Sequence, residues 1–218
     1  MSVRDVLREN DERFLGVAHG FSADDWSSPS LCARWTNHQV LAHLVVGLGA
    51  ALRCVTGAVL RHCGSFDDAN VELGTTLAAA RPSVELLDQF ERLMREPRGI
   101  GRYCPPRLLL GDHVTHELDM LFALGVDPHI PSDALAAVLN AQVAVPNPFV
   151  PAFRNSRGLR LRATDTGWRH GDRGPVVEGR ASELVSVLGN RPKVLPRLGG
   201  EGVAVLEARL SLPTHTGG

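Results

Sequence analysis

The chain has 218 residues, of which 44% are hydrophobic, so it can bury an ordinary globular core without disulfide or metal staples. Its 23 Lys and Arg residues nearly balance 24 Asp and Glu residues, which argues against a bulk basic surface for nucleic acid or an anionic membrane. The four cysteines, Cys32, Cys54, Cys63 and Cys104, form no CxxC pair, so we expect free thiols. The N-terminus is polar and no segment has about 18 uninterrupted apolar residues, so we expect a cytoplasmic protein without a signal or membrane span.

Two capping boxes mark the first two helices. Ser2 and Asp5 have the spacing of such a box, and the apolar residues that follow recur at helical intervals as far as about Gly20. Thr36 and Gln39 repeat this spacing at the start of TNHQVLAHLVVGLGAAL, which predicts one long helix with an apolar side.

Two further helices complete a predicted four-helix bundle. RPSVELLDQFERLM has Ser83 as its expected cap and an apolar stripe behind it, and Pro105 and Pro106 precede the fourth helix. A shorter helix is expected from Ser132 through about Val143. VPNPFVP then breaks the pattern with three prolines in six positions, which places a domain boundary between residues 145 and 146.

Beyond this boundary the pattern becomes mixed. GLRLRA alternates apolar and polar residues before the turn of ATDTGW, as a half-buried strand and hairpin would. VVEG is typical of another strand, ASELVSVLG of a helix closed by Gly189, and GVAVLEARL of a final apolar strand. The predicted fold class is α+β, with a helical bundle over residues 1–145 and a small α/β domain over residues 146–218.

The fourth helix carries many ionisable residues in LLLGDHVTHELDM, residues 108–120. Asp112 and His116 are four positions apart, so both can point at one place from one helical face. His43, in the apolar second helix, could complete a His, Asp, His set from across the bundle. Such mixed nitrogen and oxygen ligands suit an ion of the zinc, nickel, iron or manganese group, and the sequence does not choose among them.

Spacing alone leaves other interpretations of these residues open. His113 and Glu117 are also four positions apart, and helical geometry does not separate this pair from the first. A lone histidine in an apolar helix is more often a hydrogen-bonded core residue, and charges near a helix end are more often solvated.

A stretch near the N-terminus combines a tryptophan, a Ser-x-Cys-x-x-Trp run and a capped helix that leads to a His-Leu pair. In SADDWSSPSLCARWTNHQVLAHLV these positions are held by Trp26, Ser30, Cys32, Trp35, His43 and Leu44. The stretch resembles the mycothiol-dependent maleylpyruvate isomerase-like family. LLLGDHVTHELD resembles a second signature of that family through Asp112, His116 and Asp119, and FDDANVEL at residues 66–73 resembles a further segment.

This resemblance implies a fold for nearly the whole chain. The family belongs to the DinB-like group of metal-binding four-helix bundles. GLRLRATDTGW, the Gly-Arg pair before ASELVSVLGNRP, and LGGEGVAVL resemble the C-terminal domain that often accompanies the bundle, an α/β module similar to sterol carrier proteins.

The resemblance also implies a chemistry. It places a divalent metal, usually zinc, on His43, Asp112 and His116, with mycothiol as the thiol cosubstrate. A thiol coordinated to such an ion loses its proton and becomes a nucleophile at neutral pH. The implied reaction is isomerisation of a cis dicarboxylate by addition and elimination, or S-transfer of mycothiol to another electrophile. The isomerase is expected to have glutamate where this chain has Asp112, which is one methylene shorter and which we keep as a ligand.

Other residues have weaker assignments. Arg191 in LGNRP is our candidate for a substrate-facing catalytic arginine, the alternative being a surface pair with a carboxylate. Asp119 is expected to accept the free ring N–H of a ligating histidine, the alternative being an exposed helix charge. Cys32, Trp26 and Trp35 are expected to pack in the bundle, with no support for a nucleophilic or stacking role.

A second function from a different class stays open: a non-catalytic protein that binds a metal and a small apolar ligand. A fourth protein ligand such as His113 or Glu117 would favour it by closing the metal site. The sequence does not report the oligomeric state.

Overall fold

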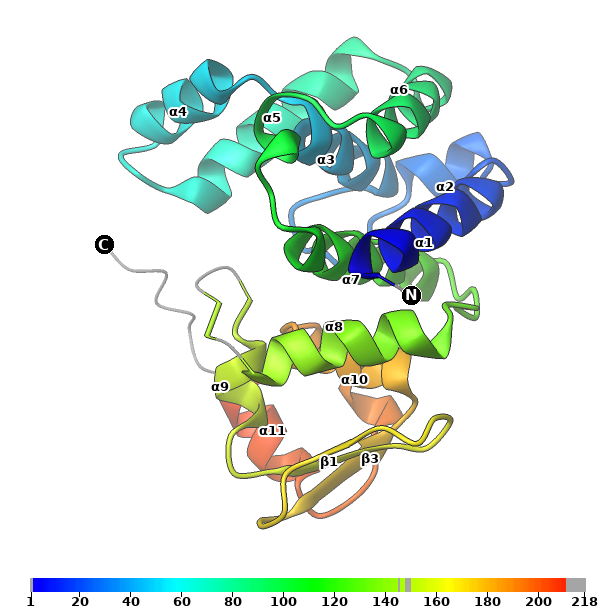
Figure 1. The fold of residues 1–218 in the computed structure, drawn as a ribbon, viewed down its shortest axis with the longest axis vertical. Helices are drawn as coiled ribbons and strands as arrows, with labels where there is room; N and C mark the ends of the chain where they lie inside the picture. Colours follow the sequence, from blue (N-terminus) through cyan, green and yellow to red (C-terminus); the bar gives the residue numbers. More distant parts are fainter. Residues whose placement is uncertain (1, 145, 148–149, 211–218) are drawn as a thin grey trace. The chain divides into compact units, whose positions relative to one another are not determined.

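The computed structural model describes residues 2–144, 146–147 and 150–210 (Figure 1). It divides into two units, Met1–Asp127 and Pro128–Gly218. This division falls before helix α8 (Ser132–Ala144), whereas the boundary expected from the prolines, between residues 145 and 146, falls after it. The reason is that α8 packs on helices of the second unit.

Four long helices of the first unit form a ring of packed neighbours: α1 (Val3–Ala18), α3 (Asn37–Gly49), α6 (Ser83–Arg95) and α7 (Pro106–Ala123). Both α1 and α3 pack on α6 and on α7. Their apolar sides share one core, in which the rings of Phe14 and Phe90 meet edge to face at a centroid distance of 5.8 Å. The predicted four-helix bundle is confirmed.

The helix boundaries follow the predicted caps with small differences. Both capping boxes form, with the Ser2 and Thr36 hydroxyls accepting from the backbone N–H three residues ahead. α6 begins at Ser83 with Pro82 as its cap, one residue earlier than predicted. α3 ends at Gly49 instead of continuing through the full apolar run, because the following residue, Ala50, is extended.

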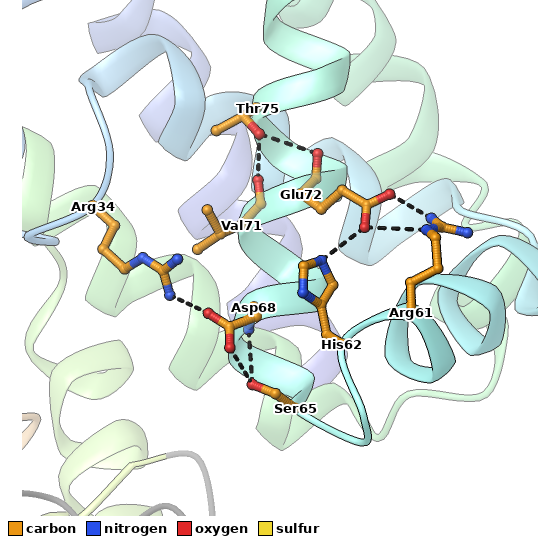
Figure 2. Close-up of polar contacts among 8 residues, drawn as sticks. All are labelled: Arg34, Arg61, His62, Ser65, Asp68, Val71, Glu72 and Thr75. Carbon is orange, nitrogen blue, oxygen red and sulfur yellow. Dashed lines mark hydrogen bonds and ion pairs between the residues drawn. The ribbon is translucent and has the colours of Figure 1, made fainter.

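Four shorter or unpredicted elements complete this unit: α2 (Ala23–Ser27), α4 (Leu52–Arg61), α5 (Phe66–Ala80) and the 3-10 turn η1 (Gly99–Arg102). α5 packs on α3, and α4 packs on α5. Figure 2 shows the polar contacts that join α4 to α5, where Arg61 and His62 both reach the carboxylate of Glu72. The chain therefore adds a helical hairpin to the outer side of α3.

The second unit places helices on a small sheet. Strands β1 (Arg160–Ala163), β2 (Arg169–His170) and β3 (Val176–Gly179) lie in the order β2-β1-β3, with β1 antiparallel to β2 and parallel to β3. α10 (Ala181–Leu188) packs on β1 and β3, and α8 and α9 (Ala152–Ser156) pack on α10 (Figure 1). The predicted α+β class is confirmed.

The last predicted strand, GVAVLEARL, is wrong. Residues Val203–Leu210 form helix α11, which follows the 3-10 turn η2 (Pro192–Arg197). Two features explain the difference. The stretch contains good helix formers, Ala, Leu, Glu and Arg, and its pairing to the sheet stops at Gly202, whose N–H donates to Val176 O at 2.7 Å.

Helix α7 is buried around most of its circumference, since it packs on α1 at one side and on α3 at another. Its polar residues therefore need partners inside the bundle. His113 Nδ1 donates to Asp11 Oδ1 at 2.8 Å, and Arg13 Nη2 donates to Glu117 Oε1 at 2.6 Å. Burial raises the pKa of Glu117 to about 7, with the Arg13 guanidinium acting in the opposite direction. No helix among the described residues, α7 included, is long and apolar enough to cross a membrane.

The stability that the Arg13–Glu117 pair contributes should depend on pH. In Arg13→Ala, the buried Glu117 carboxylate loses its ion partner, which we expect to lower the free energy of unfolding by roughly 3 kcal/mol at pH 8. The folded-state pKa of Glu117 lies above its ordinary value of 4.5, so the stability linked to this group is lost as the pH rises through the folded-state pKa. The deficit should therefore shrink to about 1 kcal/mol at pH 5, measured by urea unfolding. A deficit of the same size at both pH values would contradict this account. So would a double variant Arg13→Ala/Glu117→Gln whose deficit depends on pH as strongly as that of Arg13→Ala.

Candidate metal centre

The packing of α3 on α7 brings the three predicted ligands together. His43 comes from the middle of α3, and Asp112 and His116 come from one face of α7. Asp112 Oδ1 lies 3.6 Å from His43 Nε2 and 3.5 Å from His116 Nε2. One ligand atom from each residue lies within 4.8 Å of the others, so the group could hold a metal ion.

The two separations from Asp112 Oδ1 suit ligands of one shared ion better than direct hydrogen bonds. Tetrahedral ligands at the bond lengths usual for zinc lie about 3.3 to 3.6 Å apart, whereas a hydrogen bond between a ring nitrogen and an oxygen is shorter. The Asp112 side chain is 37% exposed and the two histidine side chains are each 10% exposed. The residues present therefore fit a divalent cation that solvent or a small molecule would reach from the Asp112 side.

Electrostatics keep Asp112 ionised. Burial alone would raise the pKa of this carboxyl, but the nearby imidazoles of His43 and His116 outweigh burial and hold that pKa well below its usual range. An ionised carboxylate is the form that binds a metal. The group therefore supplies one negative charge and two ring nitrogens.

His116 is oriented by a carboxylate on its own helix. Its Nδ1 lies 3.1 Å from Oδ2 of Asp119, whose side chain is fully buried. Because a carboxylate only accepts, Nδ1 carries the proton, and in the neutral ring Nε2 keeps its lone pair for a metal. The contact expected for Asp119 is present, and the exposed-charge alternative is wrong.

Trp35 has a contact that the sequence patterns did not support. Its indole stacks on the His43 imidazole, with ring centroids 4.7 Å apart and an interplanar angle of 29°. Trp26 packs instead on Phe21, at a centroid distance of 5.0 Å. The turn that carries Trp35 lies between two helices, so only the folded structure shows which ring it meets.

His113 and Glu117 do not join the candidate centre. Their side chains pair with Asp11 and Arg13 of α1, as described above. The sequence patterns did not predict this buried network of four residues. The reason is that Asp11 and Arg13 lie more than 100 positions before their partners on α7.

The cysteines are free thiols, as expected. Cys32 and Cys104 are partly buried against the bundle core. Burial, reinforced by Asp112, raises the pKa of the Cys104 thiol, which keeps it protonated at neutral pH. This state does not favour Cys104 as a nucleophile.

Arg191 lies in the second unit, directly before η2. Its Nη1 donates to Gly189 O at 2.5 Å, next to the end of α10. Its catalytic role stays a prediction.

The Asp119 contact can be tested through metal affinity. In Asp119→Asn, the amide cannot supply the negative charge that stabilises the His116 N–H, so we expect zinc to bind about 10-fold more weakly in a competition assay with a chromophoric chelator. Glu117→Gln is the matched control, because Glu117 is adjacent to His116 in sequence but faces α1. Equal zinc affinities in Asp119→Asn and the control would show that Asp119 does not support the ligand.

Comparisons with known proteins agree with this architecture. Residues 7–103 match the family model of the mycothiol maleylpyruvate isomerase N-terminal domain, a stretch that includes His43 and ends before Asp112. Among curated proteins, none matches the chain. Crystal structures of the mycothiol-dependent maleylpyruvate isomerase are similar in fold, and each alignment covers 91% of both chains at 13% identity. A histidine-to-alanine mutant gives a TM-score of 0.54, and the structure described without a mutation gives 0.52. Residues 7–103 are thus similar to the mycothiol maleylpyruvate isomerase N-terminal domain, which confirms the resemblance seen in the sequence.

Proposed function

We propose that this protein is a divalent-metal-dependent enzyme that uses mycothiol, either as an isomerase or as an S-transferase. The observation that carries the proposal is the grouping of His43, Asp112 and His116 within 4.8 Å, in a chain whose residues 7–103 match the mycothiol maleylpyruvate isomerase N-terminal domain. Zinc is the proposed metal, because two imidazoles and one carboxylate with an accessible side are a common catalytic zinc set. A cytoplasmic location remains part of the proposal.

The chain's residues have separate roles in this account. His43 and His116 present Nε2 atoms from two helices, and Asp112 adds an ionised oxygen at the exposed edge. Asp119 holds the proton on His116 Nδ1. A bound divalent cation would supply acidity, lowering the pKa of a coordinated thiol so that a thiolate is available at neutral pH.

The alternative of a non-catalytic metal- and ligand-binding protein has less support. A fourth ligand such as His113 or Glu117 would favour it, but both residues are paired with α1. Among the described residues, the potential metal-binding group has three members, which leaves room for a cosubstrate.

The proposed second partner is an electrophilic small molecule. The crystal structures of similar fold are of a mycothiol-dependent maleylpyruvate isomerase, so a cis dicarboxylate is the first candidate for this chain as well. Arg191 is proposed to bind a carboxylate of that substrate, since a guanidinium can donate two parallel hydrogen bonds.

Metal content tests the first half of the proposal. Protein purified without an affinity tag and supplied with zinc should carry close to one ion per chain by mass spectrometry, and His43→Ala and His116→Ala should lose most of it. His62→Ala is the matched control, because this histidine of the same unit pairs with Glu72. If the wild-type protein binds no metal even when zinc, nickel and manganese are supplied, the result would favour a non-catalytic binding protein over a metal-dependent enzyme.

Thiol accounting tests the second half. With mycothiol and a cis dicarboxylate, an isomerase leaves the free thiol concentration unchanged while substrate disappears, whereas an S-transferase consumes one thiol per product. Either activity should fall at least 100-fold in His43→Ala, an expectation based on removal of a metal ligand. Arg191→Ala should keep its metal and lose about 10-fold in kcat/KM for the diacid. Full activity in His43→Ala would exclude the catalytic metal.

A further inference from the structure

The two histidines of the candidate centre differ in the hydrogen bonding of their Nδ1 atoms. His116 Nδ1 is hydrogen-bonded to Asp119, as is usual for a metal-ligating histidine. His43 Nδ1 is buried and has no hydrogen-bond partner within the described part of the chain. Among the described residues, no hydrogen bond at Nδ1 orients the His43 ring as Asp119 orients His116.

Besides the 3.6 Å approach of Nε2 to Asp112 Oδ1, His43 has contacts with two rings and with helix α5. Trp35 stacks on the imidazole at 4.7 Å, and the His116 ring meets it edge to face at 4.8 Å. Helix α5 comes close at Gly74, where an added Cβ would lie 3.7 Å from His43 Cβ. Of these groups, Trp35 is the one that lies nearly parallel to the ring plane of His43.

Trp35 is itself fixed by a tight turn. Ser30 donates to Trp35 O from its backbone N–H at 3.0 Å and from its hydroxyl at 2.9 Å, and Trp35 N–H donates to Cys32 O at 3.0 Å. These bonds close the Ser-x-Cys-x-x-Trp run into one turn. Trp35 is 8% exposed, so the indole has little freedom to leave His43.

The turn that carries Trp35 is also bonded to helices α7 and α5. Leu31 N–H donates to the backbone oxygen of Asp119 at 3.0 Å, which joins the turn to the residue that supports His116. Arg34 Nη1 lies 2.6 Å from Asp68 Oδ1 at the start of α5 (Figure 2). Because the Arg34 and Asp68 side chains are exposed, this ion pair contributes little, and the backbone contact of the half-buried Leu31 with the buried Asp119 is the stronger anchor.

We propose that Trp35 is the positioning residue for His43, and that its stacked indole takes the place of the hydrogen bond that orients His116. This inference rests on the proposed function, because it assigns Trp35 a role toward a metal held by His43. The negative π face of an indole favours a neighbouring ring that carries positive charge, and a metal-bound imidazole is such a ring. Trp35 Nε1 is also buried without a partner among the described residues, so the indole face carries the effect, independently of its N–H.

Three variants separate stacking from general packing. Trp35→Leu removes the aromatic face and keeps apolar bulk, Trp35→Phe keeps a face and removes the N–H, and Trp26→Leu removes a tryptophan of similar burial that packs on Phe21. The readouts are the zinc dissociation constant by chelator competition, the visible absorption spectrum of the Co²⁺-loaded protein, and the midpoint of urea unfolding. The spectrum reports ligand geometry, which a loss of general packing does not change.

We expect Trp35→Leu to weaken zinc binding by 10- to 100-fold and to alter the Co²⁺ spectrum, the size of effect found for other groups that orient metal ligands. Trp35→Phe should stay within about 3-fold of wild type with a similar spectrum, since phenylalanine also offers a π face. Trp26→Leu should lower the unfolding midpoint and leave zinc affinity unchanged. If Trp35→Leu does not fold, Ser30→Ala, which loosens the turn but retains the indole, should weaken zinc binding by several-fold.

The outcomes also separate this inference from the proposed function. Wild-type protein that binds no metal overturns both. Wild-type protein that binds zinc, together with unchanged affinity and spectrum in Trp35→Leu or in the fallback variant Ser30→Ala, overturns the role of Trp35 alone. Equal losses in Trp35→Leu and Trp35→Phe, or in Trp35→Leu and Trp26→Leu, would also contradict positioning by the indole face.

Discussion

The contact between α3 and α7 is the constraint on which the candidate centre depends. α7 is buried around most of its circumference, so its buried polar side chains need partners inside the bundle. Helical spacing divides these side chains between two directions: His113 and Glu117 meet α1, and Asp112 and His116 meet His43 of α3. The four-helix ring thus keeps a structural charge network and a potential metal-binding group on one helix without mixing them.

Local signals in the sequence predicted much of this arrangement. Two capping boxes, the expected Ser83 cap and the prolines before α7 marked four helices, because caps satisfy backbone groups that every helix end exposes. The four-residue spacing placed Asp112 and His116 on one face, and their proximity follows from helix geometry alone. The position of His43 followed from the apolar helix that carries it and from the family resemblance.

Tertiary contacts decided what the sequence patterns left open. Spacing could not choose between the two four-residue pairs of α7, since the choice depends on Asp11 and Arg13 of α1. The break after Gly49 is stabilised by a distant segment, in which Arg98 N–H donates to Leu48 O and Ile100 N–H to Ala50 O, each at 2.9 Å. The stacking of Trp35 on His43 likewise joins a turn to a helix, and neither periodicity nor composition encodes such a contact.

One divalent ion is proposed to lie between His43, Asp112 and His116. Anomalous diffraction from a crystal grown with zinc, recorded on both sides of the zinc absorption edge, tests it most directly. The account predicts one anomalous peak at about 2.0 to 2.2 Å from both Nε2 atoms and an Asp112 oxygen, with a coordination position left for solvent. A peak elsewhere, or a fourth protein side chain on the ion, would contradict a catalytic centre at this place.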